Sequence, residues 1–417
     1  MKKTMIKAVF ELASPLCVSN GSEENTDKDV MRDYDRNVFI PGTSIAGALK
    51  QYLSPCDRKK VFGYIERIKK DGDFKTVSVE SPIIVYDAEI KNSPKIGLRD
   101  GIALDDCKIT LNTGKFDYET IETGAKTEFR FLMAENGCEL SDHIKNLVLA
   151  VDSGDIRFGS KKNRGLGRLK LREIYKSDFD ENNVRDYLKF GWDKMKTPWE
   201  FDKKDDGKYE KLTIPLILSG GISVRTYSAK PNEPDYTHIK CAGQPVIPGS
   251  TWNGAIRHRT KDILLELGVC KEKTEHIIQY IFGSKAGELT AAASKIVFLE
   301  SVIKGGTEIP MTRNRINRFD SSTMDGALYS ETSHFQGKCD LEIMLKGETD
   351  EKWIWGLMSL VIKDIKYGFL SVGGQTAVGR GLFADDEKFE IKDEAECIRA
   401  LNKKLEELGL EANCIAV

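Results

Sequence analysis

The chain has 417 residues, of which 40% are hydrophobic and 31% are charged, and its formal net charge is −2. This length predicts two domains rather than one, and the near-zero charge gives no overall signature of a nucleic-acid-binding protein. No apolar run is long enough for a transmembrane helix, and nine cysteines without a Cys-x-x-Cys pair argue against a zinc ribbon or disulfide framework and predict a reduced, cytoplasmic compartment.

The first half of the chain predicts mixed strands and helices. Residues 1–12 favour a strand, because Lys7 and Glu11 interrupt the apolar core that a signal peptide needs. The elements expected after this strand are an acidic loop (19–39), a helix from 43 onward, strands that include 83–87, a charged hairpin-like excursion (98–124), a helix (141–151) and a glycine-rich hairpin (156–169).

A Pro-Gly motif precedes the first of these helices and returns half a chain later. It reads IPGTSIAGALK over 40–50 and IPGSTWNGAIR over 247–257. The hydroxyl residue after Pro-Gly is predicted to cap a helix. The start of such a helix presents free N–H groups that can hold a phosphate. A single copy would also fit an ordinary corner between a loop and a helix.

A glycine-rich segment also occurs twice. The sequence IRFGSKKNRGLGRL over 156–169 aligns without a gap on LSVGGQTAVGRGLF over 370–383. These glycines follow a helix and a short strand, so they do not match the dinucleotide-binding or P-loop fingerprints. Glycine lets backbone N–H groups approach an anion closely. We therefore expect contacts to a phosphate backbone, the alternative being a tight hairpin without a ligand.

Further matches fall between these motifs in the same order. Ile83–Asp87 aligns with Ile296–Glu300, Arg99 with Arg313, and Glu119 with Glu331. Motifs that recur about half a chain apart indicate a duplicated domain rather than a solenoid with short repeats. Each copy predicts an α+β fold of the ferredoxin or RRM type. We expect a first domain over 1–175, a charged linker over 176–210, and a second domain over 211–417 that ends in a short helix.

Basic residues are clustered despite the balanced total. One cluster lies within 157–172, a second contains Arg313, Arg315 and Arg318, and a third lies over 257–261. Acidic residues concentrate elsewhere, over 178–186 and 202–206. Such clusters are often solvated faces, so clustering alone does not identify a ligand.

Taken together, the two Pro-Gly motifs and the two Gly-x-Gly segments resemble the RAMP superfamily, the repeat-associated proteins of CRISPR effector complexes. The stretch LRDGIALDDCKITLNTGKFDYETIETG over 98–124 is similar to the segment with the thumb-like hairpin in backbone subunits of type III effectors. The resemblance implies two tandem ferredoxin-like RAMP domains with glycine-rich loops and thumb-like hairpin insertions. It implies guide RNA, complementary target RNA and other effector subunits as partners, and no membrane.

The RNA contacts implied by the resemblance would go mainly to phosphate and 2′-OH groups. The residues expected to make them are Gly42, Thr43, Ser44, Lys50, Arg99, Lys161, Lys162, Arg164, Gly165, Gly167 and Arg168 in the first half, and Gly249, Ser250, Thr251, Arg257, Arg313, Arg315, Gly379, Arg380 and Gly381 in the second.

The resemblance also implies metal-dependent cleavage of target RNA by an aspartate in the loop after the first strand. Counting back from each Pro-Gly motif, Asp27 corresponds to Asp235 if one residue is skipped. We therefore expect Asp27 and Asp235 to be catalytic and to hold Mg²⁺ or Mn²⁺. Asp29 or Glu24 could replace Asp27, and the acids could also simply be solvating loop residues.

Two alternative functions remain open. The chain could be a structural RNA-binding subunit of the same complex, with inactive acidic loops. It could also process guide RNA without metal through His238 and His258, which flank the second Pro-Gly motif. The first copy has no histidine at either place, which ranks this hypothesis last.

Overall fold

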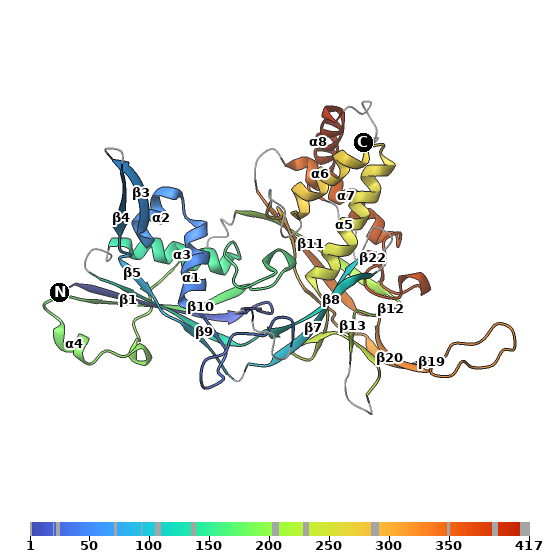
Figure 1. Cartoon of the computed structure of the whole chain (residues 1–417), viewed down its shortest axis with the longest axis horizontal. Coiled ribbons are helices and arrows are strands. Elements are labelled where there is room, and N and C mark those ends of the chain that lie inside the picture. The colour runs from blue at the N-terminus through green and yellow to red at the C-terminus, as the bar shows by residue number, and fades with distance from the viewer. Residues whose placement is uncertain are drawn as a thin grey trace. The chain divides into compact units, whose positions relative to one another are not determined.

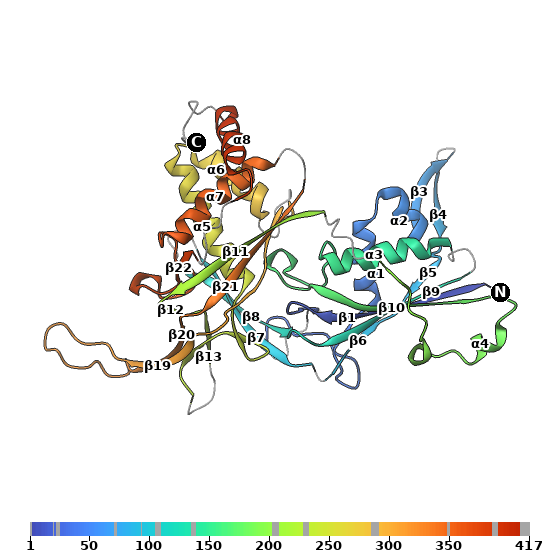
Figure 2. The ribbon, with the colours of Figure 1, turned by 180° about the vertical axis from the view of Figure 1, so that it is seen from behind.

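The computed structural model describes residues 2–19, 21, 26–70, 73–92, 94–104, 110–134, 139–201, 208–227, 233–284, 292–347, 351–385 and 391–408. The chain divides into two units (Figures 1 and 2): Met1–Arg99, Asp117–Lys162 and Leu166–Gly207 form the first, and Asp100–Phe116, Asn163–Gly165 and Lys208–Val417 form the second. Among the described residues, no helix combines the length and the apolar character needed to cross a membrane.

The first unit is built on an antiparallel sheet. Its strands are β10 (Leu169–Phe179), β1 (Lys3–Leu12), β9 (Lys126–Met133), β5 (Ile83–Val85), β6 (Ala88–Lys91) and β2 (Phe39–Ile40). β1 lies between β10 and β9, and β5 pairs with β9. With helices after β1 and β9, this is the strand order of a βαββαβ ferredoxin-like fold. The predicted fold class is therefore confirmed for this unit.

Three helices accompany this sheet: α1 (Gly42–Tyr52), α2 (Pro55–Phe62) and α3 (Ser141–Ser153). α1 and α3 bury an apolar stripe, and the core joins Ile45 and Leu49 of α1 and Leu147 of α3 to Ile6 and Phe10 of β1. Figure 1 shows these helices on one side of the sheet. A two-stranded hairpin of β3 (Tyr64–Lys70) and β4 (Asp73–Val79) follows α2.

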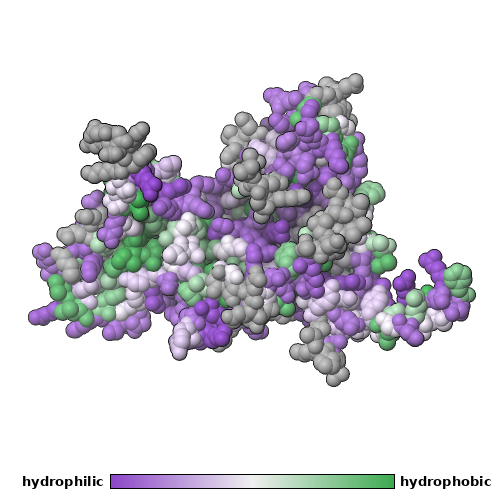
Figure 3. Space-filling model, in the orientation of Figure 1, coloured by the Kyte–Doolittle hydropathy of each residue, from purple (hydrophilic) through white to green (hydrophobic). Residues whose placement is uncertain are grey.

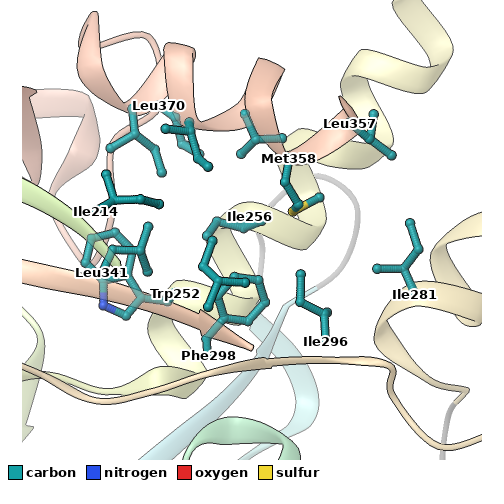
Figure 4. Close-up of a cluster of buried hydrophobic side chains, with 14 of the residues drawn as sticks. Ile214, Trp252, Ile256, Ile281, Ile296, Phe298, Leu341, Leu357, Met358 and Leu370 are labelled. Carbon is teal, nitrogen blue, oxygen red and sulfur yellow. The ribbon is translucent and has the colours of Figure 1, made fainter. Parts of the chain in front are cut away.

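The second unit repeats the arrangement. Its sheet has the order β17 (Ile296–Phe298), β21 (Lys338–Lys346), β11 (Tyr209–Ser219) and β22 (Leu382–Asp385), again with antiparallel pairing throughout. Its helices are α5 (Gly249–Glu266), α6 (Lys271–Phe282), α7 (Lys352–Lys366) and α8 (Glu394–Glu407). Figure 4 shows Trp252 beside Ile214 and Leu341 in the buried core, and its Nε1–H donates to Ser301 Oγ at 3.0 Å.

Each half also carries a long hairpin where the sequence predicts an excursion. The first is formed by β7 (Ile96–Leu104) and β8 (Thr110–Ile121), and the second by β19 (Thr307–Arg313) and β20 (Tyr329–Phe335). The β19–β20 hairpin extends far from the rest of the second unit in both views (Figures 1 and 2). β20 also pairs with β12 (Gly221–Ile222) and with β14 (Tyr236–His238). β14 in turn pairs with β13 (Arg225–Tyr227).

Short strands complete the loop before α5. β15 (Lys240–Cys241) pairs with β16 (Gln244–Ile247), and β16 pairs with β18 (Ser301–Val302). They bring the chain back from β14 to the second Pro-Gly motif.

The segment expected to be a charged linker, 176–210, packs on the first unit over 176–201, and its last residues begin β11 of the second unit. β10 continues to Phe179, and the short helix α4 (Val184–Leu188) follows. Phe179, Met195 and Met5 form a small buried cluster, and Lys7 Nζ donates to Trp192 O at 2.8 Å. This segment therefore covers side chains of β1 that the α1–α3 core does not reach.

The predicted hydroxyl caps are wrong. Pro41 and Pro248 occupy the N-cap positions, α1 and α5 begin at Gly42 and Gly249, and no side chain caps either helix. The glycines are required for a different reason. A Cβ on Gly42 would lie too close to Val85 O, and a Cβ on Gly249 would lie too close to Phe298 O. The Pro-Gly motif is thus a close backbone approach between helix and strand.

The last glycine of each glycine-rich segment is fixed by its backbone. Gly167 has a φ of +78° and Gly381 a φ of +71°. A Cβ at either position would overlap the backbone of Phe158 or Val372. Gly167→Ala and Gly381→Ala should each reduce the free energy of unfolding by about 2 kcal/mol or more, because a positive φ and a backbone clash add.

Chemical denaturation would measure these reductions. The matched controls are Gly47→Ala and Gly254→Ala, in the exposed interiors of α1 and α5 with no atom near the added Cβ. They should be neutral or stabilising by up to about 1 kcal/mol. Equal destabilisation at all four positions would contradict the assigned cause.

Candidate nucleic-acid interface

One sheet face of the second unit gathers basic and aromatic side chains. Tyr227 of β13 lies opposite Tyr236 of β14, Tyr236 lies opposite Glu331 of β20, and Arg313 of β19 lies opposite Tyr329 of β20. Residues paired across neighbouring strands point to the same side of a sheet. We call this surface the Arg–Tyr face, which consists of Arg225, Tyr227, Tyr236, Met311, Arg313, Tyr329 and Glu331.

The second glycine-rich loop lies on the Arg–Tyr face. Gln375 Nε2 donates to Glu331 Oε2 at 2.6 Å. The guanidinium Nη2 of Arg380 lies 3.7 Å from Met311 Sδ, and Arg313 Nη2 lies 3.8 Å from the same sulfur. The structure therefore brings together Arg313 and Arg380, which the sequence proposed separately.

Aromatic rings extend this basic surface. The ring centroids of Tyr227 and Tyr236 are 5.0 Å apart, and those of Tyr236 and Tyr329 are 6.4 Å apart. The Arg225 guanidinium lies 4.6 Å from the Tyr236 centroid, and that of Arg380 lies 4.5 Å from the Phe335 centroid. Cation–π contacts of this kind hold arginine side chains extended along the face. Such a surface can contact phosphates and stack bases.

Asp235 directly precedes Tyr236 of β14, and its side chain is exposed. Its Oδ2 accepts from the Ser330 backbone N–H at 2.7 Å and from Ser330 Oγ at 3.2 Å. Ser330 is the residue between Tyr329 and Glu331 on β20. The carboxylate is thus anchored to the hairpin strand and still reaches solvent.

Asp27 in the first unit is also exposed and anchored to a hairpin strand. Its Oδ2 accepts from the Asp117 backbone N–H at 3.0 Å, and Asp117 Oδ1 accepts from the Asp27 N–H at 2.9 Å. Asp117 belongs to β8. The two carboxylates therefore lie next to each other at the surface.

The alternatives to Asp27 fare differently. Asp29 is 3% exposed, and its Oδ1 accepts from the backbone N–H and the hydroxyl of Thr26, both at 2.9 Å. This aspartate shapes the loop and is not open to a ligand. Glu24 lies outside the described residues.

The Asp27–Asp117 pair fits a divalent cation better than Asp235 does. Mg²⁺ is commonly held by one or two carboxylates together with phosphate oxygens. Asp27 and Asp117 supply two carboxylates, whereas Asp235 supplies one beside the Ser330 hydroxyl. Within the described ranges, no set of three or more His, Cys, Asp or Glu side chains forms a metal site by protein ligands alone.

The glycines predicted to bind phosphate are mostly engaged within the protein. Gly167 N–H donates to Pro15 O and Gly381 N–H donates to Gly221 O, both at 2.8 Å. Gly42 N–H donates to Asp87 Oδ1 at 2.6 Å. These three N–H groups are not available to RNA, which corrects their expected role. Of the other predicted glycines, Gly165 and Gly249 are buried and Gly379 is exposed.

The predicted polar and basic residues are divided between solvent and internal contacts. Arg99 is buried. Lys161 Nζ lies 4.1 Å from the Tyr118 ring centroid, and Arg257 Nη2 lies 4.0 Å from Glu275 Oε1. The exposed residues among them are Thr43, Ser44, Lys162, Arg164 and Arg315, and the half-buried ones are Lys50, Lys161, Arg168, Ser250, Thr251, Arg257, Arg313 and Arg380.

The β19–β20 hairpin exposes both arginine and apolar side chains beyond its strands. Phe319 is fully exposed, Leu328 is 69% exposed, and Arg315 and Arg318 lie close to them in the sequence. Figure 3 shows hydrophilic and hydrophobic residues mixed along this hairpin at the right of the view.

Sequence reasoning missed Asp117, Arg225 and the tyrosines of the Arg–Tyr face. The alternation Arg225-x-Tyr227 was the only local signal, and it is short. The match of Glu119 with Glu331 pointed to the right strand without assigning a role. Asp117 and Ser330 belong to these same strands.

Neither histidine of the metal-free hypothesis forms an open acid/base pair. His238 is 1% exposed, and its Nδ1 accepts from the Val224 N–H at 3.1 Å. His258 Nδ1 lies 3.1 Å from Asp262 Oδ2 one turn away on α5. Burial, with a smaller contribution from His334, lowers the pKa of His238 to about 4.

Comparison with known proteins follows the duplicated architecture. A family model described as the RAMP superfamily matches residues 9–170 and 215–384. No curated protein sequence matches the chain. Among solved structures, a chain of the "Cryo-EM structure of the Type III-B Cmr-beta bound to cognate target RNA" is similar at 14% identity and a TM-score of 0.34, over 42% of this chain. This chain spans 61% of the length of that one.

The low pKa of His238 predicts a stability change with pH. The unfolded state binds a proton near pH 6.5 and the folded state only near pH 4. The contribution of His238 to stability should be complete above about pH 6.5 and fall as the pH drops toward 4. Melting temperatures measured from pH 7.5 to 5 should therefore decline, and His238→Asn should flatten the decline.

Asparagine is chosen because its Oδ1 can accept the Val224 N–H in place of Nδ1. His276→Asn, at an exposed position on α6, is the matched control and should leave the pH profile unchanged. Parallel profiles for wild type and His238→Asn would show that another group titrates.

Proposed function

Because the chain belongs to the RAMP superfamily, we propose that it binds guide RNA and complementary target RNA as a subunit of a type III CRISPR effector complex. The type III assignment rests on the sequence resemblance of residues 98–124. The RNA-binding assignment rests on the geometry of the second unit. Neighbouring effector subunits would cover further parts of the RNA.

The observation that carries this proposal is the Arg–Tyr face with the glycine-rich loop on it. Arg225, Arg313 and Arg380 come from three segments far apart in the sequence and meet around Glu331 and Met311. Three arginines next to one carboxylate leave a local positive excess, although the whole chain has a charge of −2. Arginine recognises phosphate, and tyrosine rings accept the faces of bases.

This binding mode depends little on the nucleotide sequence of the RNA. Contacts to phosphate and ribose position a strand without distinguishing its bases, and stacking tolerates every base. A subunit that holds guide RNA of any sequence needs this property. Specificity for the target would then come from base pairing between the two RNAs.

Arginine-to-glutamine variants test the assignment of the face. Arg225→Gln, Arg313→Gln and Arg380→Gln should each weaken binding of the full chain to single-stranded RNA. Each should also reduce the slope of log affinity against log salt by about 0.7 for every phosphate that no longer faces an arginine. Fluorescence anisotropy over a salt series gives both quantities.

Arg399→Gln on α8 is the matched control, since it removes one exposed arginine from another part of the same unit. It should change neither affinity nor slope. If the three face variants kept the wild-type slope, their side chains would not contact phosphate.

We further propose that target RNA is cleaved at the exposed aspartates. The ribose 2′-OH attacks the adjacent phosphorus, the bond from phosphorus to the 5′ oxygen breaks, and a 2′,3′-cyclic phosphate and a 5′-OH remain. In this proposal Asp27 would accept the 2′-OH proton or hold a divalent ion with Asp117, Asp235 would act at a second position, and solvent would supply the proton to the leaving 5′ oxygen. A bound Mg²⁺ would neutralise the charge that develops on the phosphate.

Cleavage by the assembled complex tests this step. With guide RNA, labelled complementary RNA and Mg²⁺, Asp27→Ala should reduce one set of cuts by about 10²-fold, and Asp235→Ala should reduce another. RNA binding should be retained, because neither carboxylate contributes positive charge. Asp35→Ala is the control, because Asp35 is an exposed acid of the same loop as Asp27. A complex with this variant should cleave target RNA as the wild type does.

The remaining outcomes separate the alternatives. Unchanged cleavage by the double variant would eliminate both aspartates. A wild-type complex that binds target RNA but does not cut it would favour the structural subunit with inactive loops. Cutting of precursor guide RNA by the isolated chain in EDTA would favour the histidine hypothesis, against which the burial of His238 argues.

A further inference from the structure

Each unit buries one glutamate at the same place in its hairpin strand. Glu119 of β8 is 9% exposed and Glu331 of β20 is 1% exposed. Glutamate is seldom buried unless it is paired. The two align in the sequence, and neither is required by the reactions proposed above.

Glu331 connects three segments of the second unit. Its Oε1 lies 3.1 Å from Arg313 Nε of β19, and its Oε2 accepts from Gln375 Nε2 of the glycine-rich loop at 2.6 Å. Arg225 Nη2 of β13 lies 3.6 Å from Oε2. A single carboxylate thus sits beneath the arginines of the Arg–Tyr face.

Glu119 in the first unit is also bound by an arginine, but from the loop that carries Asp27. Arg32 binds it through two nitrogens, Nη1 to Oε2 at 2.9 Å and Nη2 to Oε1 at 3.1 Å. The Val30 N–H donates to Oε2 at 3.0 Å, and the Glu119 N–H donates to Lys28 O at 3.0 Å. Glu119 therefore fastens the loop that carries Asp27 to β8.

The charge balance gives these contacts a functional consequence. The side chains of Arg225 and Arg313 are each about one third exposed. A buried carboxylate fixes their direction, but it also cancels one of their positive charges. The face therefore has a lower net charge, and a more defined geometry, than its arginines would give alone.

We infer that Glu331 and Glu119 are positioning residues: Glu331 orients the RNA-facing arginines at the expense of raw electrostatic affinity, and Glu119 holds the Asp27 loop in register with its strand. This inference rests on the proposed RNA binding. It assigns no contact between either glutamate and RNA.

Glu331→Gln gives a result that a merely structural role would not. The amide keeps the size of the side chain and removes its charge, so the face gains one positive charge. Binding of single-stranded RNA by the full chain should become tighter at low salt, and the salt slope should steepen by about 0.7. Loss of structure alone would weaken binding and flatten the slope.

Glu308→Gln is the matched control. Glu308 lies on β19, on the side of the strand opposite to Arg313, and pairs with Lys240. It changes the net charge equally and should leave the slope unchanged. Equal steepening in both variants would mean that total charge matters rather than Glu331.

A double variant distinguishes the effect of charge from an effect of misfolding in Glu331→Gln. Glu331→Gln combined with Arg225→Gln restores the charge balance and should return the slope to the wild-type value. A slope in well-folded Glu331→Gln equal to or shallower than wild type would overturn the inference. If wild-type protein failed to bind RNA at all, the proposed function itself would fail, so the two failures are distinguishable.

Glu119→Gln tests the first unit by a different readout. An amide cannot accept from Arg32 and Val30 as the carboxylate does, so the Asp27 loop should loosen. In the assembled complex, cuts that depend on Asp27 should fall about tenfold, while cuts that depend on Asp235 and overall RNA affinity should persist. A uniform fall at all cuts would contradict the positioning role.

Discussion

The site in each unit depends on one backbone arrangement that closes the glycine-rich loop. Phe158 N–H donates to Gly167 O at 3.0 Å, and in the second unit Val372 N–H donates to Gly381 O at 2.9 Å. The loop can fold back this tightly only because these glycines have positive φ and lack a Cβ. In the second unit this closure is what places Gln375 against Glu331.

The two units share the order of their central strands and differ in chemistry. The exposed aspartate is held by a hairpin strand in both, but the residue holding it is Asp117 in one and Ser330 in the other. One unit therefore offers two neighbouring aspartates, and the other offers one aspartate beside the Ser330 hydroxyl. Duplication fixed the positions, and the side chains then diverged, which is the usual relation between a fold and the sites it carries.

The duplicated architecture could be predicted from the sequence, because the motifs recur in one order and glycine spacing reports backbone conformation directly. The Arg–Tyr face could not, because pairing Tyr236 with Glu331 requires the strand register. The sequence also could not predict which backbone N–H groups already have an acceptor within the protein. Gly42, Gly167 and Gly381 look like anion-binding glycines in sequence, yet the protein's own oxygens occupy their N–H groups.

Local charge makes the proposed RNA binding compatible with a net charge of −2. Electrostatic attraction to RNA acts over about one Debye length, roughly 8–10 Å at physiological salt. Only charged groups within that distance of a bound strand matter, and at the Arg–Tyr face these include three arginines around one buried carboxylate, and Lys115 over the Tyr227 ring. Acidic groups elsewhere lower the total without weakening this surface. A buried glutamate at the centre then sets how strongly, and in which geometry, the arginines act.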